Sequence, residues 1–305
     1  MRPGAIAVMA TGAALALAAC GGGGEPGTSE GAGRAGPPVR IGTKDFTEQF
    51  ILGELYRQAL QAKGFRVALK RDIGSSEIIH EALAGGGLDM YPEYVGVLLS
   101  EIANRRERPR SPGAAYRAAR AFEEQGGFTL LAMTPFSDSN ALAVKPAFAR
   151  RHKLRTIADL GRISGTVQIG APPEFRTRFE GLVGLAERYG LDNLKARPLA
   201  IGKQYRALEQ GEVDAAAVFT TDGQLAGRGY VLLKDSRGLF ASQHVAPVIS
   251  RRSLRAHGRR LAAAIDAVSR RLSTRAMREM NAAVDEDGRS PSRVADAFLR
   301  RERLK

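Results

Sequence analysis

Short apolar runs alternate with longer amphipathic stretches over most of the chain. The run Val39–Gly42 is of β type, and a polar loop that carries Lys44 follows it. Apolar residues at Ile51, Leu55 and Ala59 then recur at helical spacing. Similar strand-then-helix patterns continue along the chain, and this alternation predicts an α/β fold.

The loop between the first strand and the first helix is a candidate site. Asp45 and Glu48 have the spacing of a capping box, so Asp45 is expected to cap the helix. Such a junction leaves backbone N–H groups pointing outward, which favours an anion. Ligand sites of open α/β sheets also lie at the carboxyl ends of strands. Lys44 is therefore expected to face a ligand.

The chain contains an internal sequence repeat. Residues 167–171 repeat the pattern of residues 39–43, and from the end of the next helix onward the two copies match at a constant offset of 125 residues. The matched positions include Leu88 and Asp89 with Val213 and Asp214, and Tyr94 with Phe219. These matches predict two related βαβ lobes. The alternative is that all α/β units share such features.

The pattern of elements predicts how the lobes divide the chain. Lobe one is expected to comprise residues 39–139 and 244–305, and lobe two residues 140–243. Two extended crossover segments would join the lobes. This bilobed α/β layout has one cleft and allows hinge closure about a ligand.

The first residues are not expected to belong to the fold. Residues 1–20 read as a signal peptide that ends in a lipobox, Leu17-Ala18-Ala19-Cys20. Cys20 is the only cysteine, and acylation would account for it. The alternative is an ordinary signal peptide cut nearby. Residues 21–38 are rich in Gly, Ser, Glu and Pro and predict a flexible tether. The sequence therefore predicts a lipid-anchored protein outside the bacterial cytoplasm.

Composition narrows the class of function. The formal net charge of +14 could indicate a nucleic-acid-binding protein, but the arginines are spread among glutamates and an exported protein seldom meets DNA. The sequence contains no phosphate-binding loop, nucleophile elbow or metal-type His/Cys spacing. We therefore expect a binding protein and not an enzyme, with no catalytic residue, metal or cofactor.

The repeat also selects candidate ligand-binding residues. Equivalent aromatic residues end corresponding strands, and an aromatic ring from each lobe could hold a cation. An arginine could bind a carboxylate through two parallel hydrogen bonds. The alternatives without a ligand are that the aromatic residues belong to the core, that the lysine is solvated, and that Glu174 and Arg178 form a surface ion pair. The candidates are Lys44, Tyr94, Asn140, Glu174, Arg178, Phe219 and Gln243.

Five motifs resemble the substrate-binding lipoproteins of osmoprotectant ABC importers, and the resemblance covers nearly all of residues 39–304, in order. The motifs are residues 41–49 (IGTKDFTEQ), 74–77 (GSSE), 91–96 (YPEYVG), 170–175 (GAPPEF) and 220–223 (TTDG). The resemblance implies the bilobed type II periplasmic-binding-protein fold. It also implies glycine betaine, choline, carnitine or a related quaternary amine as ligand, and a permease with its ATPase as partners.

The resemblance implies roles for the candidates. The family surrounds the ammonium group with four tyrosines, of which Tyr94 matches one. Asn140, Phe219 and Gln243 stand at the other three positions, so the aromatic cage is reduced. Val97 stands where the family has a threonine, while the family's lysine, glutamate and arginine are matched by Lys44, Glu174 and Arg178.

Because the aromatic cage is reduced, the resemblance does not decide which solute is bound. A zwitterion with a carboxylate is expected, bound more weakly or with changed specificity. The alternative is a different small carboxylate-bearing solute, such as an amino acid or its derivative. An enzyme on a similar bilobed fold and a sensor protein are the rivals from other classes.

Overall fold

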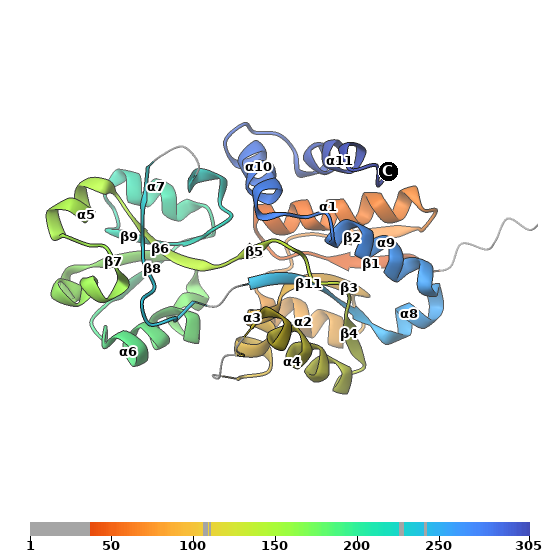
Figure 1. Cartoon of the computed structure of the whole chain (residues 1–305), viewed down its shortest axis with the longest axis horizontal. Coiled ribbons are helices and arrows are strands. Elements are labelled where there is room, and N and C mark those ends of the chain that lie inside the picture. Colours follow the sequence, from red (N-terminus) through yellow and green to blue (C-terminus); the bar gives the residue numbers. More distant parts are fainter. Residues whose placement is uncertain (1–36, 106–108, 110, 226–228, 241–242) are drawn as a thin grey trace, which may run out of the picture. The chain divides into compact units, whose positions relative to one another are not determined.

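The computed structural model describes residues 37–105, 109, 111–225, 229–240 and 243–305. Two β-sheets with flanking helices make up this part of the chain (Figure 1). The predicted signal peptide, nearly all of the tether and Cys20 lie outside the described residues. Within these ranges, no helix is both long enough and apolar enough to cross a membrane.

The first sheet has six strands, in the order β2-β1-β3-β11-β4, with β5 paired to β11. β1 runs parallel to β2 and β3, whereas β11 runs antiparallel to β3, β4 and β5. The strands are β1 Val39–Gly42, β2 Val67–Lys70, β3 Met90–Tyr94, β4 Phe128–Leu130, β5 Ser137–Asp138 and β11 Gln243–Ser250.

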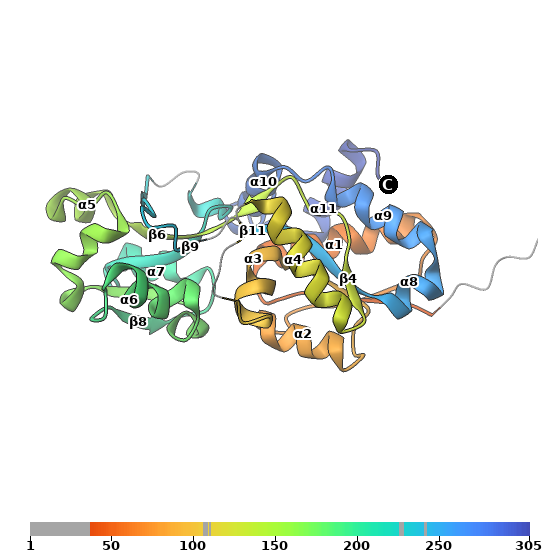
Figure 2. The same ribbon diagram turned by 60° about the horizontal axis from the view of Figure 1, so that its bottom comes forward.

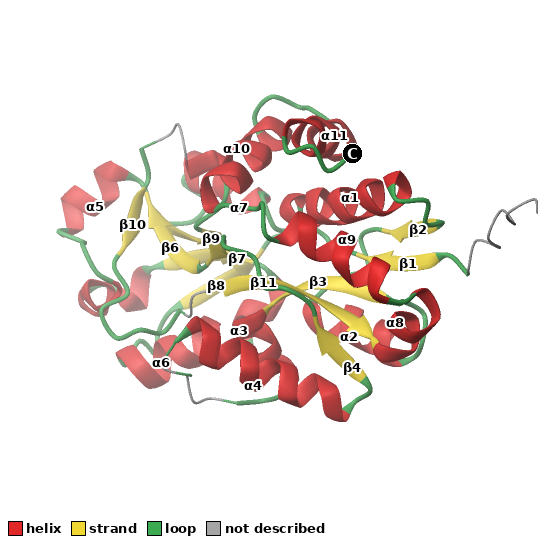
Figure 3. Cartoon of the chain, turned by 45° about the vertical axis from the view of Figure 1, so that its right-hand side comes forward, coloured by secondary structure: helices red, strands yellow, loops and turns green. Residues whose placement is uncertain are grey.

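Helices cover both faces of the first sheet (Figure 3). Ile41, Met90 and Val245 pack on the α1, α9, α10 and α11 side, and Tyr91 and Val248 pack on the α2 and α4 side. Successive side chains of a strand thus pack into the cores on opposite faces of the sheet, because side chains alternate in direction along a strand. Figure 2 shows α3 and α4 side by side on the second of these faces. The helices are α1 Thr47–Ala62, α2 Ser76–Ala84, α3 Val95–Val97, η1 Leu98–Ile102, α4 Pro112–Gln125, α8 Arg251–His257, α9 Arg259–Ser269, α10 Thr274–Asp285 and α11 Pro291–Arg301.

The second sheet has five strands, in the order β10-β6-β9-β7-β8. Its strands are β6 Asn140–Val144, β7 Gln168–Ala171, β8 Lys195–Pro198, β9 Ala215–Phe219 and β10 Val231–Leu233. The helices and short helical turns around it are α5 Pro146–His152, η2 Ile157–Arg162, η3 Ser164–Thr166, η4 Pro173–Arg176, η5 Phe179–Val183, α6 Gly184–Tyr189, α7 Lys203–Gln210 and η6 Gly223–Leu225.

The internal repeat is a repeat of topology. The order β2-β1-β3 in the first sheet corresponds to β8-β7-β9 in the second, and an antiparallel strand follows in both. Asp89 accepts a hydrogen bond from the backbone N–H of Arg40 at 2.9 Å, and Asp214 accepts one from Gln168 at 2.9 Å. The repeated aspartate therefore joins the start of β3 to β1 in the first sheet and the start of β9 to β7 in the second. The two-lobed α/β prediction is confirmed, while the lobe boundaries stay a prediction.

One local prediction is wrong. Helix α1 begins at Thr47, and Phe46 is its N-cap residue without a side-chain capping bond. Asp45 therefore does not cap the helix. Glu48 accepts hydrogen bonds from Tyr94 and Asn281 instead of closing a capping box. Tertiary partners have replaced the local role that the spacing suggested.

Glu123 in α4 carries a buried carboxyl group. It is 1% exposed, and neither side-chain oxygen has a hydrogen-bond partner among the described residues. The nearest cationic candidate is His80, whose Nδ1 lies 3.8 Å from Oε1. Burial, with a contribution from the charge of Glu93, raises the pKa of Glu123 to about 7.

Glu123→Gln is expected to reduce the pH dependence of stability. The folded-state pKa lies above the ordinary value of 4.5, so wild-type stability falls as the pH rises from about 4.5 to about 7. The fall attributable to Glu123 is on the order of 3 kcal/mol. Free energies of unfolding in urea at pH 5 and pH 8 would measure it. A fall of equal size in the variant would contradict the assignment.

Candidate functional site

A buried ion pair lies where β1 meets α1. Lys44 follows β1 and Glu93 lies in the neighbouring strand β3; their Nζ and Oε1 atoms are 2.6 Å apart. Ser76 accepts a second hydrogen bond from Nζ at 3.0 Å. Lys44 is only 4% exposed, so the solvated-lysine alternative is wrong. Burial lowers the pKa of Lys44, and the charge of Glu93 acts against this shift.

Three aromatic rings form a stack beside this pair. The ring of Phe46 stacks on Tyr94 at a centroid distance of 6.3 Å and on Phe219 at 5.6 Å. The Lys44 ammonium lies 4.3 Å from the Tyr94 ring centroid and 5.7 Å from that of Phe46. The predicted aromatics from the two sheets are therefore connected, through a third ring that the sequence analysis missed. Its position two residues after Lys44 was the available signal.

Arg178, next to the second sheet, binds the carboxylate of Glu77 in α2, a helix of the first sheet. Its Nε and Nη2 atoms donate to the two oxygens of Glu77 at 3.2 and 2.8 Å. Glu101 and Glu174 lie 3.9 and 3.8 Å from the guanidinium. The Glu174–Arg178 ion pair, which was the alternative interpretation of these two residues, is thus the looser contact. Burial alone would raise the pKa of Glu77, but the hydrogen bond and charge of Arg178 outweigh it and lower the pKa to about 2.

The two predicted amides meet at one carboxylate. Asn140 and Gln243 donate from their side-chain nitrogens to Oε2 of Glu180, at 2.7 and 3.2 Å. Gln243 also accepts from the backbone N–H of Val97 at 3.2 Å. A Cβ on Gly96 would lie 2.3 Å from the Gln243 side chain, so the close approach requires glycine there. Glu180 is a site residue that the sequence analysis missed.

The predicted residues are therefore grouped and not scattered. A pocket of about 40 Å³ is lined by Asn140, Glu174 and Arg178, together with Val97 and Glu180. Lys44, Tyr94 and Gln243 are buried beside these groups, at 4%, 5% and 3% exposure. Tyr94 also belongs to the core of the first sheet, so its core alternative holds in part. Their role in ligand binding stays a prediction.

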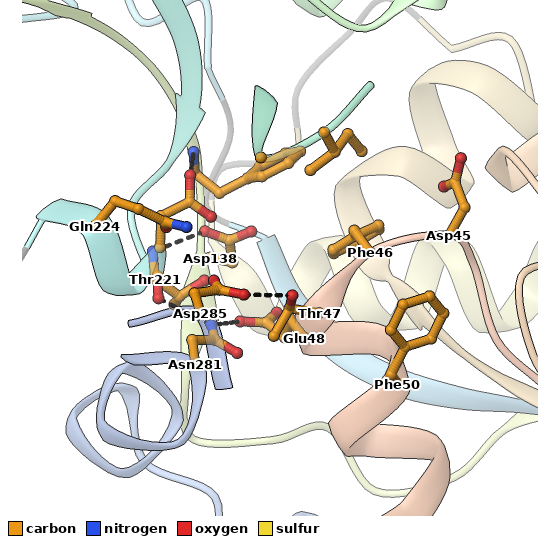
Figure 4. Close-up of a pocket in the computed structure, with 14 residues that line it drawn as sticks. Asp45, Phe46, Thr47, Glu48, Phe50, Asp138, Thr221, Gln224, Asn281 and Asp285 are labelled. Atoms are coloured by element: carbon orange, nitrogen blue, oxygen red, sulfur yellow. Dashed lines mark hydrogen bonds between the residues drawn. The ribbon is translucent and has the colours of Figure 1, made fainter. Parts of the chain in front are cut away.

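Figure 4 shows a second, larger pocket, whose volume is about 160 Å³. Of the predicted site residues, only Phe219 is in its described lining. Its other lining groups come mainly from the start of α1, from β5, from the segment after β9 and from α10. Glu48, Asp138, Thr221 and Asn281 are among them. Glu48 and Asn281 are 233 positions apart, and no local pattern brings such distant residues together.

Comparison with protein families decides the class. A family described as the substrate-binding domain of ABC-type glycine betaine transport systems matches residues 37–301. The chain belongs to this family. Its members are substrate-binding proteins of importers, so the resemblance and the predicted solute-binding function are confirmed.

Individual relatives agree with the family. A glycine-betaine-binding protein of Pseudomonas aeruginosa is 32% identical over 277 residues, covering 87% of this chain and 88% of that protein. An ergothioneine transport permease/ergothioneine binding protein of Helicobacter pylori is 26% identical over 266 residues. The match covers 87% of this chain and 47% of that protein. The solved structure of a glycine betaine/carnitine/choline ABC transporter protein has 26% identity and a TM-score of 0.69, covering 87% of this chain and 99% of that one. The last likeness confirms the predicted fold.

The Lys44–Glu93 pair is expected to show strong coupling in a double-mutant cycle. Glu93→Leu leaves a buried ammonium unpaired and should cost about 3–5 kcal/mol of unfolding free energy. Lys44→Met combined with Glu93→Leu should recover most of that loss. Urea unfolding measures both variants.

The control is the exposed pair Arg275–Glu279, whose side chains are 90% and 51% exposed. Glu279→Leu should change the unfolding free energy by less than about 1 kcal/mol. Additive losses for the Lys44 and Glu93 substitutions would show that the two charges do not depend on each other.

Proposed function

We propose that the chain binds glycine betaine or a related small zwitterion between its two sheets and delivers it to a membrane permease. The observation that carries this proposal is the position of Arg178. This guanidinium, next to the second sheet, binds a carboxylate from α2 of the first sheet's helices through two hydrogen bonds. A ligand carboxylate has the same chemistry as the Glu77 side chain.

The carboxylate end of the solute would bind Arg178 in place of Glu77. A planar guanidinium offers two parallel donors to one carboxylate, and this geometry is already realised in the contact with Glu77. Glu174 lies 3.8 Å from Nη1 and would keep the guanidinium oriented during the exchange. Lys44, held by Glu93, would supply further positive charge to this region.

The cationic end would face Tyr94 and Phe219. A ring face contributes roughly 0.5–2 kcal/mol to the binding of a cation. Phe46 lies between these two rings and adds a third aromatic group to the reduced cage. Relatives whose names state glycine betaine, carnitine and choline support a methylated ammonium here.

The runner-up solute is an amino acid or amino-acid derivative. Asn140 and Gln243 place amide groups, together with the carboxylate of Glu180, where tyrosines were expected. Carboxylate and amide oxygens accept hydrogen bonds from an amine, whereas a trimethylammonium group has no N–H to donate. A relative named for ergothioneine supports an amino-acid derivative as the solute, although the trimethylated ammonium of ergothioneine has no N–H to donate.

Arg178→Ala is expected to weaken glycine betaine binding by roughly tenfold or more, since a charge-assisted hydrogen bond contributes about 1.5–3 kcal/mol. Choline lacks a carboxylate, so its Kd should change by less than about threefold on the same grounds. Calorimetry with glycine betaine, choline, carnitine, ergothioneine and common amino acids measures these affinities.

Arg176→Ala is the matched control, because Arg176 is an exposed arginine in the same segment. It should leave both affinities unchanged. Equal losses for glycine betaine and choline in Arg178→Ala would remove the proposed role. Binding of an amino acid without any quaternary amine would favour the runner-up solute.

We also propose that Cys20 carries a lipid that tethers the protein to the bacterial membrane. Cells fed labelled palmitate are expected to incorporate label into the wild-type chain and none into Cys20→Ala, and globomycin should shift the mobility of the wild type only. Label in the Cys20→Ala chain would contradict the anchor site.

A further inference from the structure

We propose that the acidic pocket, defined by Glu48, Asp138, Asp222, Asp285 and Asn281, binds an organic cation that carries N–H groups, such as a guanidinium or a primary ammonium. This site lies beside the proposed solute site and shares only Phe219 with its predicted residues. Neither Lys44 nor Arg178 lines it.

The pocket lies between the two sheets. Glu48 comes from α1 and Asp285 and Asn281 come from α10, which pack on the first sheet, while Asp222 follows β9 of the second. Asp138 lies in β5, directly before the chain enters the second sheet. Figure 4 shows Glu48, Asp138, Thr221, Asn281 and Asp285 gathered at one end, with Phe46 beside them. A ligand here would contact groups of both sheets.

The described lining contains five carboxylates and no lysine or arginine. The hydrogen-bond donors to the buried carboxyl groups are uncharged: Glu48 accepts from Tyr94 and Asn281, and Asp222 accepts from Tyr205 at 2.6 Å. In the described part of the chain, no basic group lies within ion-pair distance of Glu48, Asp138, Asp222 or Asp285. Several acidic side chains thus face one cavity without a basic partner in the described part of the chain, which favours a cationic ligand.

Asn281 supplies an independent indication. It is 2% exposed and lines the pocket, and its Oδ1 is buried with no hydrogen-bond partner among the described residues. Its Nδ2 donates to Glu48 at 3.1 Å and to the carbonyl of Thr221 at 2.8 Å, and this backbone carbonyl can only accept. The amide orientation is therefore fixed by its neighbours. The remaining oxygen is an acceptor that awaits a donor.

This unpartnered acceptor distinguishes between cations. A guanidinium or primary ammonium can donate to Oδ1 of Asn281 and to the free lone pairs of the carboxylates, whereas a tetramethylammonium ion cannot. The His, Cys, Asp and Glu side chains of the described residues form no group suited to a metal ion. Phe46, Phe50 and Phe219 would accommodate an apolar stem attached to the cationic head.

The carboxyl pKa values agree with this geometry. Burial raises the pKa of Glu48 and of Asp138, and it raises that of Asp222 to about 7. The negative charge of Glu48 raises the pKa values of Asp138 and Asp222 further. The positive charge of Lys44 acts against the rise in the pKa of Glu48. Protons therefore occupy part of the pocket near neutral pH. A bound cation would displace them, so its affinity should rise between pH 6 and pH 8.

The test titrates the full chain with guanidinium, ethylammonium and tetramethylammonium chlorides at constant ionic strength, at pH 6 and pH 8. Amide chemical shifts in NMR, including the Asn281 side chain, report binding at the pocket. The first two ions are expected to bind at least tenfold more tightly than tetramethylammonium and more tightly at pH 8. Equal affinity of the three ions, or no shift at Asn281, would overturn the proposal.

Variants localise the effect. Asp222→Asn and Asp285→Asn should each weaken guanidinium binding at least fivefold at pH 8; Asp285 is exposed and its variant is expected to fold even if Asp222→Asn does not. Glu279→Gln removes one negative charge from an exposed position of the same helix, α10, and should have no effect. Unchanged binding in a folded Asp285→Asn protein, or a loss in Glu279→Gln, would contradict the site.

The proposal is separable from the proposed function. Glycine betaine titrated into the same proteins reports the solute site, whose predicted anchor is Arg178. Guanidinium binding that fails while glycine betaine still binds overturns only the acidic pocket. Guanidinium binding that persists in a chain that binds no zwitterion supports the pocket and leaves the proposed solute without support.

Discussion

The buried ion pair of Lys44 and Glu93 is the interaction on which the site depends. An ammonium group without a partner costs several kcal/mol in such an environment. Glu93 at 2.6 Å and the ring of Tyr94 at 4.3 Å hold the charge in one position. Because Lys44 follows β1 and Glu93 lies in β3, pairing them also fixes the loop that leads to Phe46 and α1. The aromatic stack is placed by the same constraint.

The same rule of charge pairing governs the other parts of the site. Arg178 is neutralised by Glu77, and the carboxylate of Glu180 is bound by two amides. A solute with both a positive and a negative end can exchange with such internal pairs without leaving a buried charge uncompensated. The acidic pocket is the exception, since its carboxylates have only uncharged partners among the described residues. The exception is what indicates a second ligand.

The sequence predicted the fold because its signals were local or repeated. The run Val39–Gly42 and the matched aspartates Asp89 and Asp214 correspond to strands and contacts that recur in both sheets. The sequence also placed Lys44 and Arg178 in polar surroundings between the sheets. It could not identify Glu77 as the partner of Arg178, because 101 positions separate them and only tertiary packing brings them together. Glu48 was misassigned because its spacing from Asp45 fits a capping box equally well.

The most direct test of the central claim is a crystal structure of the chain with glycine betaine. The account predicts the ligand carboxylate on the guanidinium of Arg178 in place of Glu77, with the trimethylammonium group against Tyr94 and Phe219 and the Lys44–Glu93 pair retained. A ligand bound elsewhere, with the Arg178–Glu77 contact intact and both rings untouched, would contradict it.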